Sequence, residues 1–208
     1  MKNILLINGK KRSGKDTSAK IIKEELINQG KSVKILSFAD TLKDMVCEMF
    51  NISRADLEYL KNNTNCYEHS IVSPSGIGML ELPNFRTFLD CFGNSIAKRL
   101  GGDSVWADII LKQVLETDYE YYIIPDFRFP IEIDVFNLAH VFGKSLFQLN
   151  VTTLQVQRNG LPHSDLISEN SLNDFTFDYI IDNNSDLENI KKQVVTILAD
   201  ININKKDK

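Results

Sequence analysis

Residues 3–17 read NILLINGKKRSGKDT, and this stretch decides the fold. The apolar run at residues 4–7 is typical of a buried strand, and residues 9–15 follow with the spacing GxxxxGK. Apolar residues at helical spacing after Lys15 predict a helix that ends before Gly30. In such a strand, loop and helix, the loop N–H groups and the positive end of the helix dipole converge on one anion. The stretch therefore predicts a phosphate-binding loop.

The loop also indicates which atoms would hold a nucleotide. Lys15 is expected to reach the β- and γ-phosphates. Asp16 occupies the next position, where Ser or Thr is usual, and Thr17 follows it. Both are candidate magnesium ligands, although Asp16 has the alternative role of stabilising the first helical turn electrostatically. The residues expected to bind the nucleotide are Gly9, Lys11, Arg12, Ser13, Gly14, Lys15, Asp16 and Thr17.

Beyond the loop, apolar runs alternate with helix-period segments, which predicts an α/β fold with a parallel five-stranded sheet flanked by helices. The apolar runs predict strands at residues 3–8, 33–38, 121–124, 146–151 and 177–181. The helical spacing predicts helices at residues 39–50, 85–100, 104–115 and 130–142, and a closing helix marked by apolar residues from 187 to 198.

We expect a single domain whose core comprises residues 1–38 and 116–208. Residues 39–115 are expected to form a helical substrate-binding region. Within this region, residues 62–83 are rich in Asn, Ser, Gly and Pro and predict a long loop. The polar stretch at about 152–175 is expected to be a lid.

Composition excludes several classes of protein. The chain has 208 residues, 43% of them hydrophobic, and a net charge of -4, so it is neither disordered nor basic enough for a dedicated nucleic-acid coat. We expect no export signal or membrane span, because the first apolar run is short and no apolar stretch approaches about 20 residues. Cys47, Cys66 and Cys91 lack the spacing of a zinc site or disulfide framework. We expect reduced thiols in a cytoplasmic protein.

Four stretches occur in the order seen in one enzyme family: residues 11–17, 37–43 (SFADTLK), 86–106 and 121–128 (YYIIPDFR). Together they resemble the bacteriophage-type deoxynucleoside monophosphate kinases. The resemblance implies a P-loop kinase fold, ATP and Mg²⁺ as cofactors and small nucleotides as partners. A homodimer is one option for the oligomeric state. Phosphomevalonate kinases of the same superfamily share the Gly-Lys-Asp variant of the loop.

The chain departs from this family at two places. Asp90 stands where the family often has Gln, so an acceptor-only group replaces one that both donates and accepts. Leu166 stands where the family commonly has His, three residues before Glu169. The first departure bears on which base is accepted.

Phosphoryl transfer requires positioning and charge neutralisation rather than covalent help. We therefore expect Lys15, Asp16, Asp126, Arg128 and Arg158 to be catalytic, with Asp126 also a magnesium ligand at the end of a buried strand. Alternatives remain for three of them. Asp126 is also suited to cap the next helix and Arg128 to pair with Glu132, and for Arg158 the sequence alone does not locate the arginine of a lid.

For the acceptor, we expect Lys43, Arg86 and Arg128 to bind phosphate, and Asp40, Asp90 and Trp106 to lie near the nucleoside. Four of these residues, Lys43, Arg86, Trp106 and Asp40, have a structural alternative. Lys43 is equally suited to a solvated helix surface, Arg86 to a salt bridge at a helix start, Trp106 to a core and Asp40 to an N-cap.

The leading hypothesis is direct transfer of phosphate from ATP to a deoxynucleoside monophosphate. A second hypothesis is a P-loop kinase for another small phosphorylated acceptor, resembling phosphomevalonate or dephospho-coenzyme A. A third is a nucleotide-dependent switch. The sequence argues against a switch, because it has no NKxD element of the kind with which GTPases read the base. The Asn183-Asn184 pair is a poor substitute for that element.

Overall fold

The computed structural model describes residues 1–62, 85–100, 102–142, 148–164 and 167–203. It divides into two compact units. The core unit comprises Met1–Phe38 and Ala107–Lys208, and the second unit comprises Ala39–Trp106. The second unit is thus inserted into the chain of the core unit.

The core unit is built on a parallel sheet in the strand order β2-β3-β1-β4-β5. Its strands are β1 (Lys2–Asn8), β2 (Val33–Ile35), β3 (Tyr121–Ile124), β4 (Leu149–Gln157) and β5 (Tyr179–Asp182). The α/β class and the five-stranded parallel sheet are confirmed. β1 lies between β3 and β4, and its residues 4–7 are at most 1% exposed, as expected of a strand covered on both faces.

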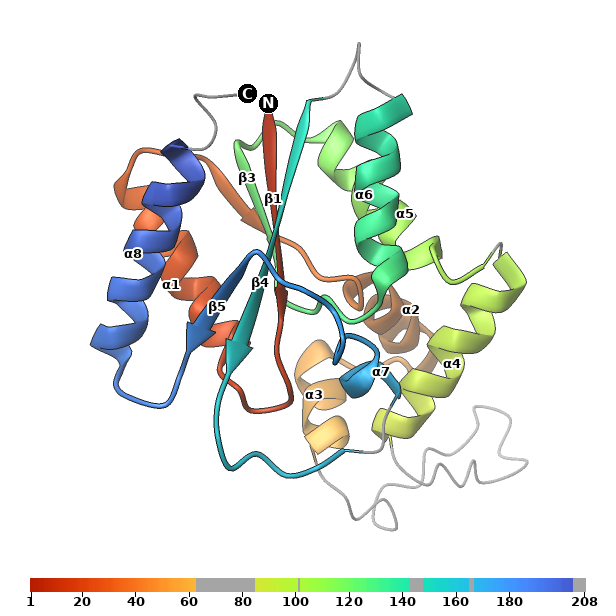
Figure 1. The fold of residues 1–208 in the computed structure, drawn as a ribbon. Helices are drawn as coiled ribbons and strands as arrows, with labels where there is room; N and C mark the ends of the chain where they lie inside the picture. The colour runs from red at the N-terminus through yellow and green to blue at the C-terminus, as the bar shows by residue number, and fades with distance from the viewer. Residues whose placement is uncertain (63–84, 101, 143–147, 165–166, 204–208) are drawn as a thin grey trace, which may run out of the picture. The chain divides into compact units, whose positions relative to one another are not determined.

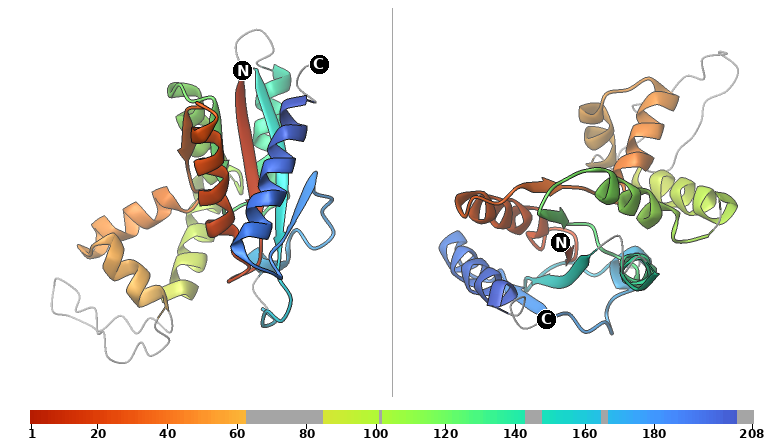
Figure 2. Two further views of the ribbon diagram at one scale, coloured as in Figure 1. Left: turned by 90° about the vertical axis from the view of Figure 1, so that its left-hand side faces the viewer. Right: turned by 90° about the horizontal axis from the view of Figure 1, so that it is seen from above.

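Helices cover both faces of this sheet (Figure 1). The helices α1 (Lys15–Asn28) and α8 (Leu187–Ile203) pack against each other on one face, as the view from above shows (Figure 2). The other face carries α6 (Pro130–Phe142), which packs on β4, and α5 (Val105–Glu116), whose residues from Ala107 onward belong to the core unit. Leu26 of α1 and Val194 of α8 are among the fully buried side chains between helices and sheet.

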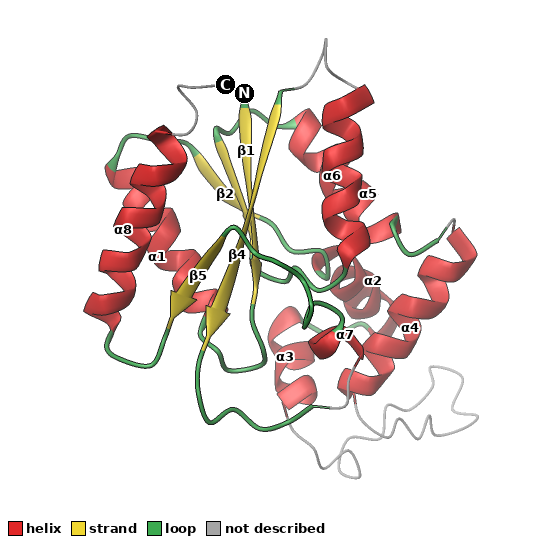
Figure 3. Ribbon diagram, in the orientation of Figure 1, coloured by secondary structure: helices red, strands yellow, loops and turns green. Residues whose placement is uncertain are grey.

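Because all five strands are parallel, the segments that follow them emerge at one edge of the sheet (Figure 3). The phosphate loop follows β1, Asp126 and Arg128 follow β3, and Arg158 follows β4. The short helix α7 (Ile167–Asn170) forms in the segment between β4 and β5. The parallel topology therefore gathers the predicted catalytic segments of the core unit.

Two predicted strand boundaries are wrong. β2 ends at Ile35 rather than residue 38. β4 continues to Gln157, whereas a lid was expected from residue 152. The polar Thr152 and Thr153 suggested irregular chain, but both are buried, and Asp178 accepts hydrogen bonds from the N–H and hydroxyl of Thr153. The polar segment after β4 therefore begins at Arg158.

The second unit contains α2 (Asp40–Phe50), α3 (Arg54–Asn62) and α4 (Phe85–Leu100). Its core comprises the buried Val46, Leu57, Phe85 and Leu89, with further aromatic rings packed against them. Helix α3 was not predicted, although Ser53 and Asp56 form a reciprocal capping pair at its start. Its predicted neighbour, the loop at residues 62–83, lies almost entirely outside the described residues.

Candidate functional site

The phosphate loop adopts a conformation with two left-handed residues. Arg12 has φ 67° and Gly14 has φ 95°, and the N–H of Ser13 donates to the carbonyl of Lys10 at 2.9 Å. Alternation of left- and right-handed residues turns successive N–H groups toward one side, which creates an anion-binding concavity. A side chain at Gly9 would collide with Ser13 Oγ. That hydroxyl is buried and has no hydrogen-bond partner among the described residues.

Asn183, in the loop after β5, holds the phosphate loop from one side. Its Nδ2 donates to the carbonyl of Ser13 at 2.7 Å, and its own N–H donates to the carbonyl of Gln157. A Cβ on Gly14 would collide with the same amide group. Sequence reasoning considered this asparagine only as a poor base-reading element. Its contact with the phosphate loop gives it a structural role there.

Lys15 begins α1 with its side chain largely buried, at 13% exposure. Within the described residues its ion-pair partner is Asp16, whose Oδ2 lies 3.7 Å from Lys15 Nζ, beyond hydrogen-bond reach. Asp16 is 74% exposed and Thr17 is also exposed. Within the described residues, the ammonium group thus has no hydrogen bond to a carboxylate. Such a group is suited to an incoming phosphate.

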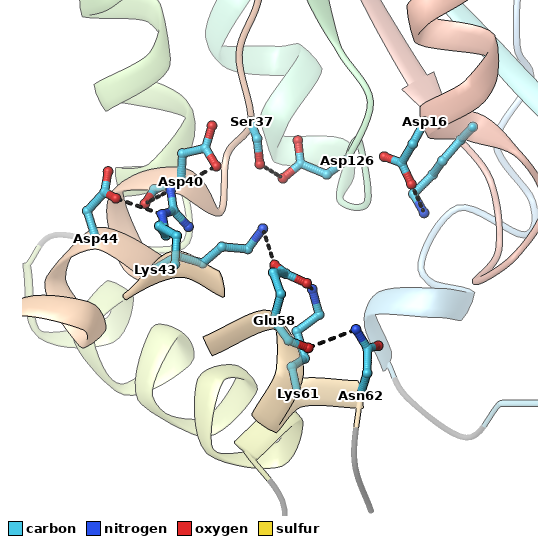
Figure 4. A network of polar contacts seen from close by, with 11 residues as sticks. Asp16, Ser37, Asp40, Lys43, Asp44, Glu58, Lys61, Asn62 and Asp126 are labelled. Carbon is cyan, nitrogen blue, oxygen red and sulfur yellow. Dashed lines mark hydrogen bonds and ion pairs between the residues drawn. The ribbon is translucent and has the colours of Figure 1, made fainter. Parts of the chain in front are cut away.

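Asp126 follows β3 and binds the end of the connection from β2. Its two carboxylate oxygens accept hydrogen bonds from Ser37 Oγ at 2.7 Å and from the N–H of Phe38 at 3.0 Å (Figure 4). The chain enters the second unit directly after Phe38. Asp126 therefore fixes the last residues of the core unit before the insertion. Its predicted role as a magnesium ligand stays a prediction.

Arg128 is held by a buried carboxylate that sequence reasoning did not assign to the site. Its Nη1 lies 2.7 Å from Glu169 Oε1 and donates to the carbonyl of Ser168 at 3.0 Å. The other oxygen of Glu169 accepts the N–H of Lys11 at 2.9 Å. Glu169 thus joins the segment after β3 to the phosphate loop.

Glu132 caps the helix that follows Arg128. Its Oε2 accepts hydrogen bonds from the N–H groups of Arg128 at 2.7 Å and Phe129 at 3.0 Å. Burial raises the pKa of Glu132 to about 8. The nearby Asp126 also raises this pKa, whereas the two backbone hydrogen bonds favour the ionised form and lower it. Glu132 therefore contacts the backbone of Arg128, while the guanidinium pairs with Glu169.

Arg158 is exposed and follows the last residue of β4 directly. In the described residues it has no hydrogen bond or ion pair. Its role in a lid stays a prediction.

In the second unit, two lysines share one carboxylate. Glu58 Oε1 lies 3.3 Å from Lys43 Nζ, and Glu58 Oε2 lies 2.7 Å from Lys61 Nζ (Figure 4). Burial lowers the pKa of Lys61, and the positive charges of Lys43 and Arg86 add to this effect against the opposing influence of Glu58. Although partial burial opposes it, the lysines bring the pKa of Glu58 below its ordinary value. The Glu58 carboxylate thus stands between two lysines, and a third cation, Arg86, acts on Lys61.

Asp40 is not an N-cap. Ala39 occupies that position without a side-chain cap, and Asp40 lies in the first turn of α2. Its carboxylate pairs with Arg54 at 3.1 Å, and Arg54 also pairs with Asp44 at 2.8 Å. Arg54 begins α3, a helix that was not predicted, and this pairing joins Asp40 to it.

Asp90 and Trp106 complete the predicted acceptor residues. Both are half-buried in the second unit, Asp90 on α4 and Trp106 in the first turn of α5. The structure thus places the predicted donor-binding residues in the core unit. It places the predicted acceptor-binding residues, Arg128 excepted, in the second unit.

The phosphate loop follows β1 of the parallel sheet and opens α1, which is the strand, loop and helix context expected for the GxxxxGK spacing. No protein-family model matches the chain, and no curated protein matches it significantly. Among solved structures, it is similar to a mutant of the APS kinase CysC of Mycobacterium tuberculosis, with TM-score 0.47 and 11% identity over 95% of this chain and 97% of that one. The same enzyme in complex with AMPPNP and APS gives TM-score 0.42 and 12% identity, over 95% and 96%. No helix in the described part of the chain is long and apolar enough to span a bilayer.

Proposed function

We propose that this protein is a kinase that transfers a phosphoryl group from ATP to a deoxynucleoside monophosphate. The observation that carries the proposal is the position of Arg128. The carboxylate of Glu169 accepts hydrogen bonds both from the Arg128 guanidinium and from the backbone N–H of Lys11 in the phosphate loop. A second cation fixed beside a phosphate loop is what transfer to an acceptor requires, because negative charge must be neutralised on the transferring group.

The loop fits the phosphates of ATP. It offers backbone N–H groups, the buried hydroxyl of Ser13 and the ammonium of Lys15, which lacks a hydrogen bond within the described residues. Residues 9–17 would hold the β- and γ-phosphates, with Arg128 on the transferring group. Arg158, at the start of the segment 158–175, would approach ATP when that segment closes as a lid and excludes water.

Magnesium would neutralise charge on the phosphates when it is bound. The candidate ligands on this chain fit that role by their chemistry. Asp16 presents an exposed carboxylate and Thr17 an exposed hydroxyl next to Lys15. Asp126 accepts hydrogen bonds from Ser37 and Phe38, and its carboxylate is of the ligand type that suits magnesium or its bound waters.

The second unit offers a site for the phosphate of the acceptor. Lys43 and Lys61 both pair with the single carboxylate of Glu58, and the positive charge of Arg86 acts on Lys61. A nucleoside monophosphate carries a phosphate dianion that these cations would bind. Asp40, Asp90 and Trp106 would then contact the nucleoside, and transfer would be direct and in line, without a phosphorylated protein intermediate.

The test is ADP formation by the purified protein with ATP and Mg²⁺. The acceptor panel contains all deoxynucleoside and ribonucleoside monophosphates, mevalonate phosphate, dephospho-coenzyme A, APS and a control without acceptor. Turnover that requires a deoxynucleoside monophosphate supports the proposal. Turnover with one of the other acceptors alone contradicts the proposed substrate, and the absence of acceptor-dependent turnover contradicts kinase activity.

Lys15→Ala ties any activity to this site. Removal of the ammonium from the phosphate loop is expected to lower kcat/KM by at least about 100-fold, because transition-state charge loses its nearest fixed partner. Lys20→Ala is the matched control, since Lys20 is an exposed lysine on the same helix. Equal activity of the two variants would show that the observed turnover does not arise at the loop.

A further inference from the structure

Glu169 is an ionisable group buried in the core unit, and its own part in the reaction is not yet assigned. Its side chain is 2% exposed, and each of its oxygens has a different partner. Oε2 accepts the N–H of Lys11 in the phosphate loop, and Oε1 accepts from Arg128 Nη1. These partners precede it by 158 and 41 positions in the chain. The carboxylate therefore joins three segments that are remote in sequence.

The contacts also determine how Arg128 can act. Both hydrogens of Nη1 are engaged, one by Glu169 and one by the carbonyl of Ser168. Nη2 and Nε have no hydrogen-bond partner in the described residues. A guanidinium is planar, so anchoring one nitrogen fixes the direction of the other donors. Arg128 is therefore held by one end and retains three N–H donors for an anion.

We infer that Glu169 is a positioning residue for phosphoryl transfer. It holds the Arg128 guanidinium in the arrangement that binds the transferring phosphate, and the Lys11 amide anchors its carboxylate to the phosphate loop. This inference rests on the proposed function. It differs from a purely structural ion pair, because a structural pair would support folding without a specific effect on what Arg128 does in the reaction.

A double-mutant cycle separates these two roles. In Glu169→Gln, one of the two accepting oxygens becomes an NH2 group, which donates. This group would face either Arg128 or Lys11, both of which also donate, so one of them loses its acceptor. With the best acceptor from the panel, Glu169→Gln is expected to lower kcat by about 10- to 100-fold, as loss of an outer-sphere orienting group typically does, and to change the KM for ATP less than about threefold. In an Arg128→Ala background, the same substitution is expected to change kcat less than about threefold.

Multiplicative effects of the two substitutions on kcat would overturn the inference, since Glu169 would then act independently of Arg128. Glu169→Asp provides a second variant if the Gln variant fails to fold. It keeps the charge but withdraws the carboxylate by one methylene, and it is expected to show the same dependence on Arg128.

A second readout does not require activity. In the protein without nucleotide, ¹⁵N NMR measures hydrogen exchange of the Lys11 amide and the Arg128 Nη1 and Nε protons. Glu169→Gln is expected to accelerate exchange at Lys11 or at Arg128 Nη1 at least about tenfold. Asp178→Asn is the control, because Asp178 accepts two hydrogen bonds from Thr153 in the same unit and has no such contact with Lys11 or Arg128.

The two experiments distinguish failure of this inference from failure of the proposed function. A wild-type protein that phosphorylates no acceptor, while exchange at Lys11 or Arg128 still depends on Glu169, contradicts the kinase proposal and leaves the positioning contacts supported. An active wild-type protein whose exchange and kcat ignore Glu169 overturns the inference alone.

Discussion

Replacing Glu132 by Gln tests whether a buried carboxyl group near the candidate site is neutral at physiological pH. Both hydrogen bonds from the backbone go to one oxygen, Oε2. A Gln side chain can therefore accept both with its own amide oxygen. The substitution keeps the cap of α6 and removes the ability to ionise.

The magnitude follows from the pKa. Burial raises the pKa of Glu132 from 4.5 to about 8. Between these values the folded protein keeps a proton that the unfolded chain releases, so the free energy of unfolding falls as the pH rises. The two values differ by about 3.5, and each pKa unit is worth about 1.36 kcal/mol, so the full loss is about 5 kcal/mol. About 4 kcal/mol of it falls between pH 5 and pH 9.

The assay is urea unfolding of both proteins at about pH 5, 7 and 9, without nucleotide or divalent cation. Glu132→Gln is expected to be more stable than wild type by an amount that grows by about 4 kcal/mol from pH 5 to pH 9. Glu188→Gln is the control, because Glu188 lies exposed in the first turn of α8. A stability difference between wild type and Glu132→Gln that stays constant over this range would refute the reasoning. The carboxyl would then be ionised at neutral pH.

Two further predictions concern the phosphate loop and the acceptor cluster. Gly14→Ala is expected to lower the free energy of unfolding by more than about 1 to 2 kcal/mol, because the new Cβ collides with Asn183 in addition to the cost of a left-handed non-glycine residue. The same substitution is expected to weaken ATP binding, measured by calorimetry. Lys61→Ala removes a cation that pairs with Glu58 and that is proposed to bind the acceptor phosphate. In steady-state kinetics, it is expected to raise the KM for the acceptor about tenfold and to leave the KM for ATP unchanged.

Each has a matched control. Gly160→Ala carries the same backbone cost at φ 70°, but open space surrounds the added Cβ. Equal stability losses at the two glycines would mean that Asn183 does not constrain the loop. Lys98→Ala removes an exposed lysine from the second unit. An unchanged acceptor KM in Lys61→Ala would remove Lys61 from the acceptor site.

The features that the sequence predicted correctly depend on neighbouring residues. The apolar run of residues 4–7 and the periodicity after Lys15 are local patterns, and β1 and α1 form where they predict. Their local character also made the five strands recognisable. The order of these strands did not follow from the apolar spacing, because that spacing does not say which strands pair.

The features that the sequence analysis missed depend on contacts across the chain. Glu169 meets Lys11 through the fold, and no pattern near either residue signals this pairing. β4 was ended too early because Thr152 and Thr153 are polar, and only their burial and the partner Asp178 explain why they continue the strand. The capping pair of Ser53 and Asp56 that begins α3 is the exception, because it is a local signal that the sequence itself carries.

The strand order has a consequence for synthesis of the chain. β1 and β2 emerge from the ribosome first, yet they never pair, because β3 lies between them. β3 is made only after the whole inserted unit, Ala39–Trp106. The first two strands must therefore wait with unpaired edges, and a direct β1 to β2 pairing is the misfolded arrangement that competes with the native one. In a nascent chain that stalls before Tyr121, the apolar strand that carries the phosphate loop would keep unpaired edges, which favours aggregation.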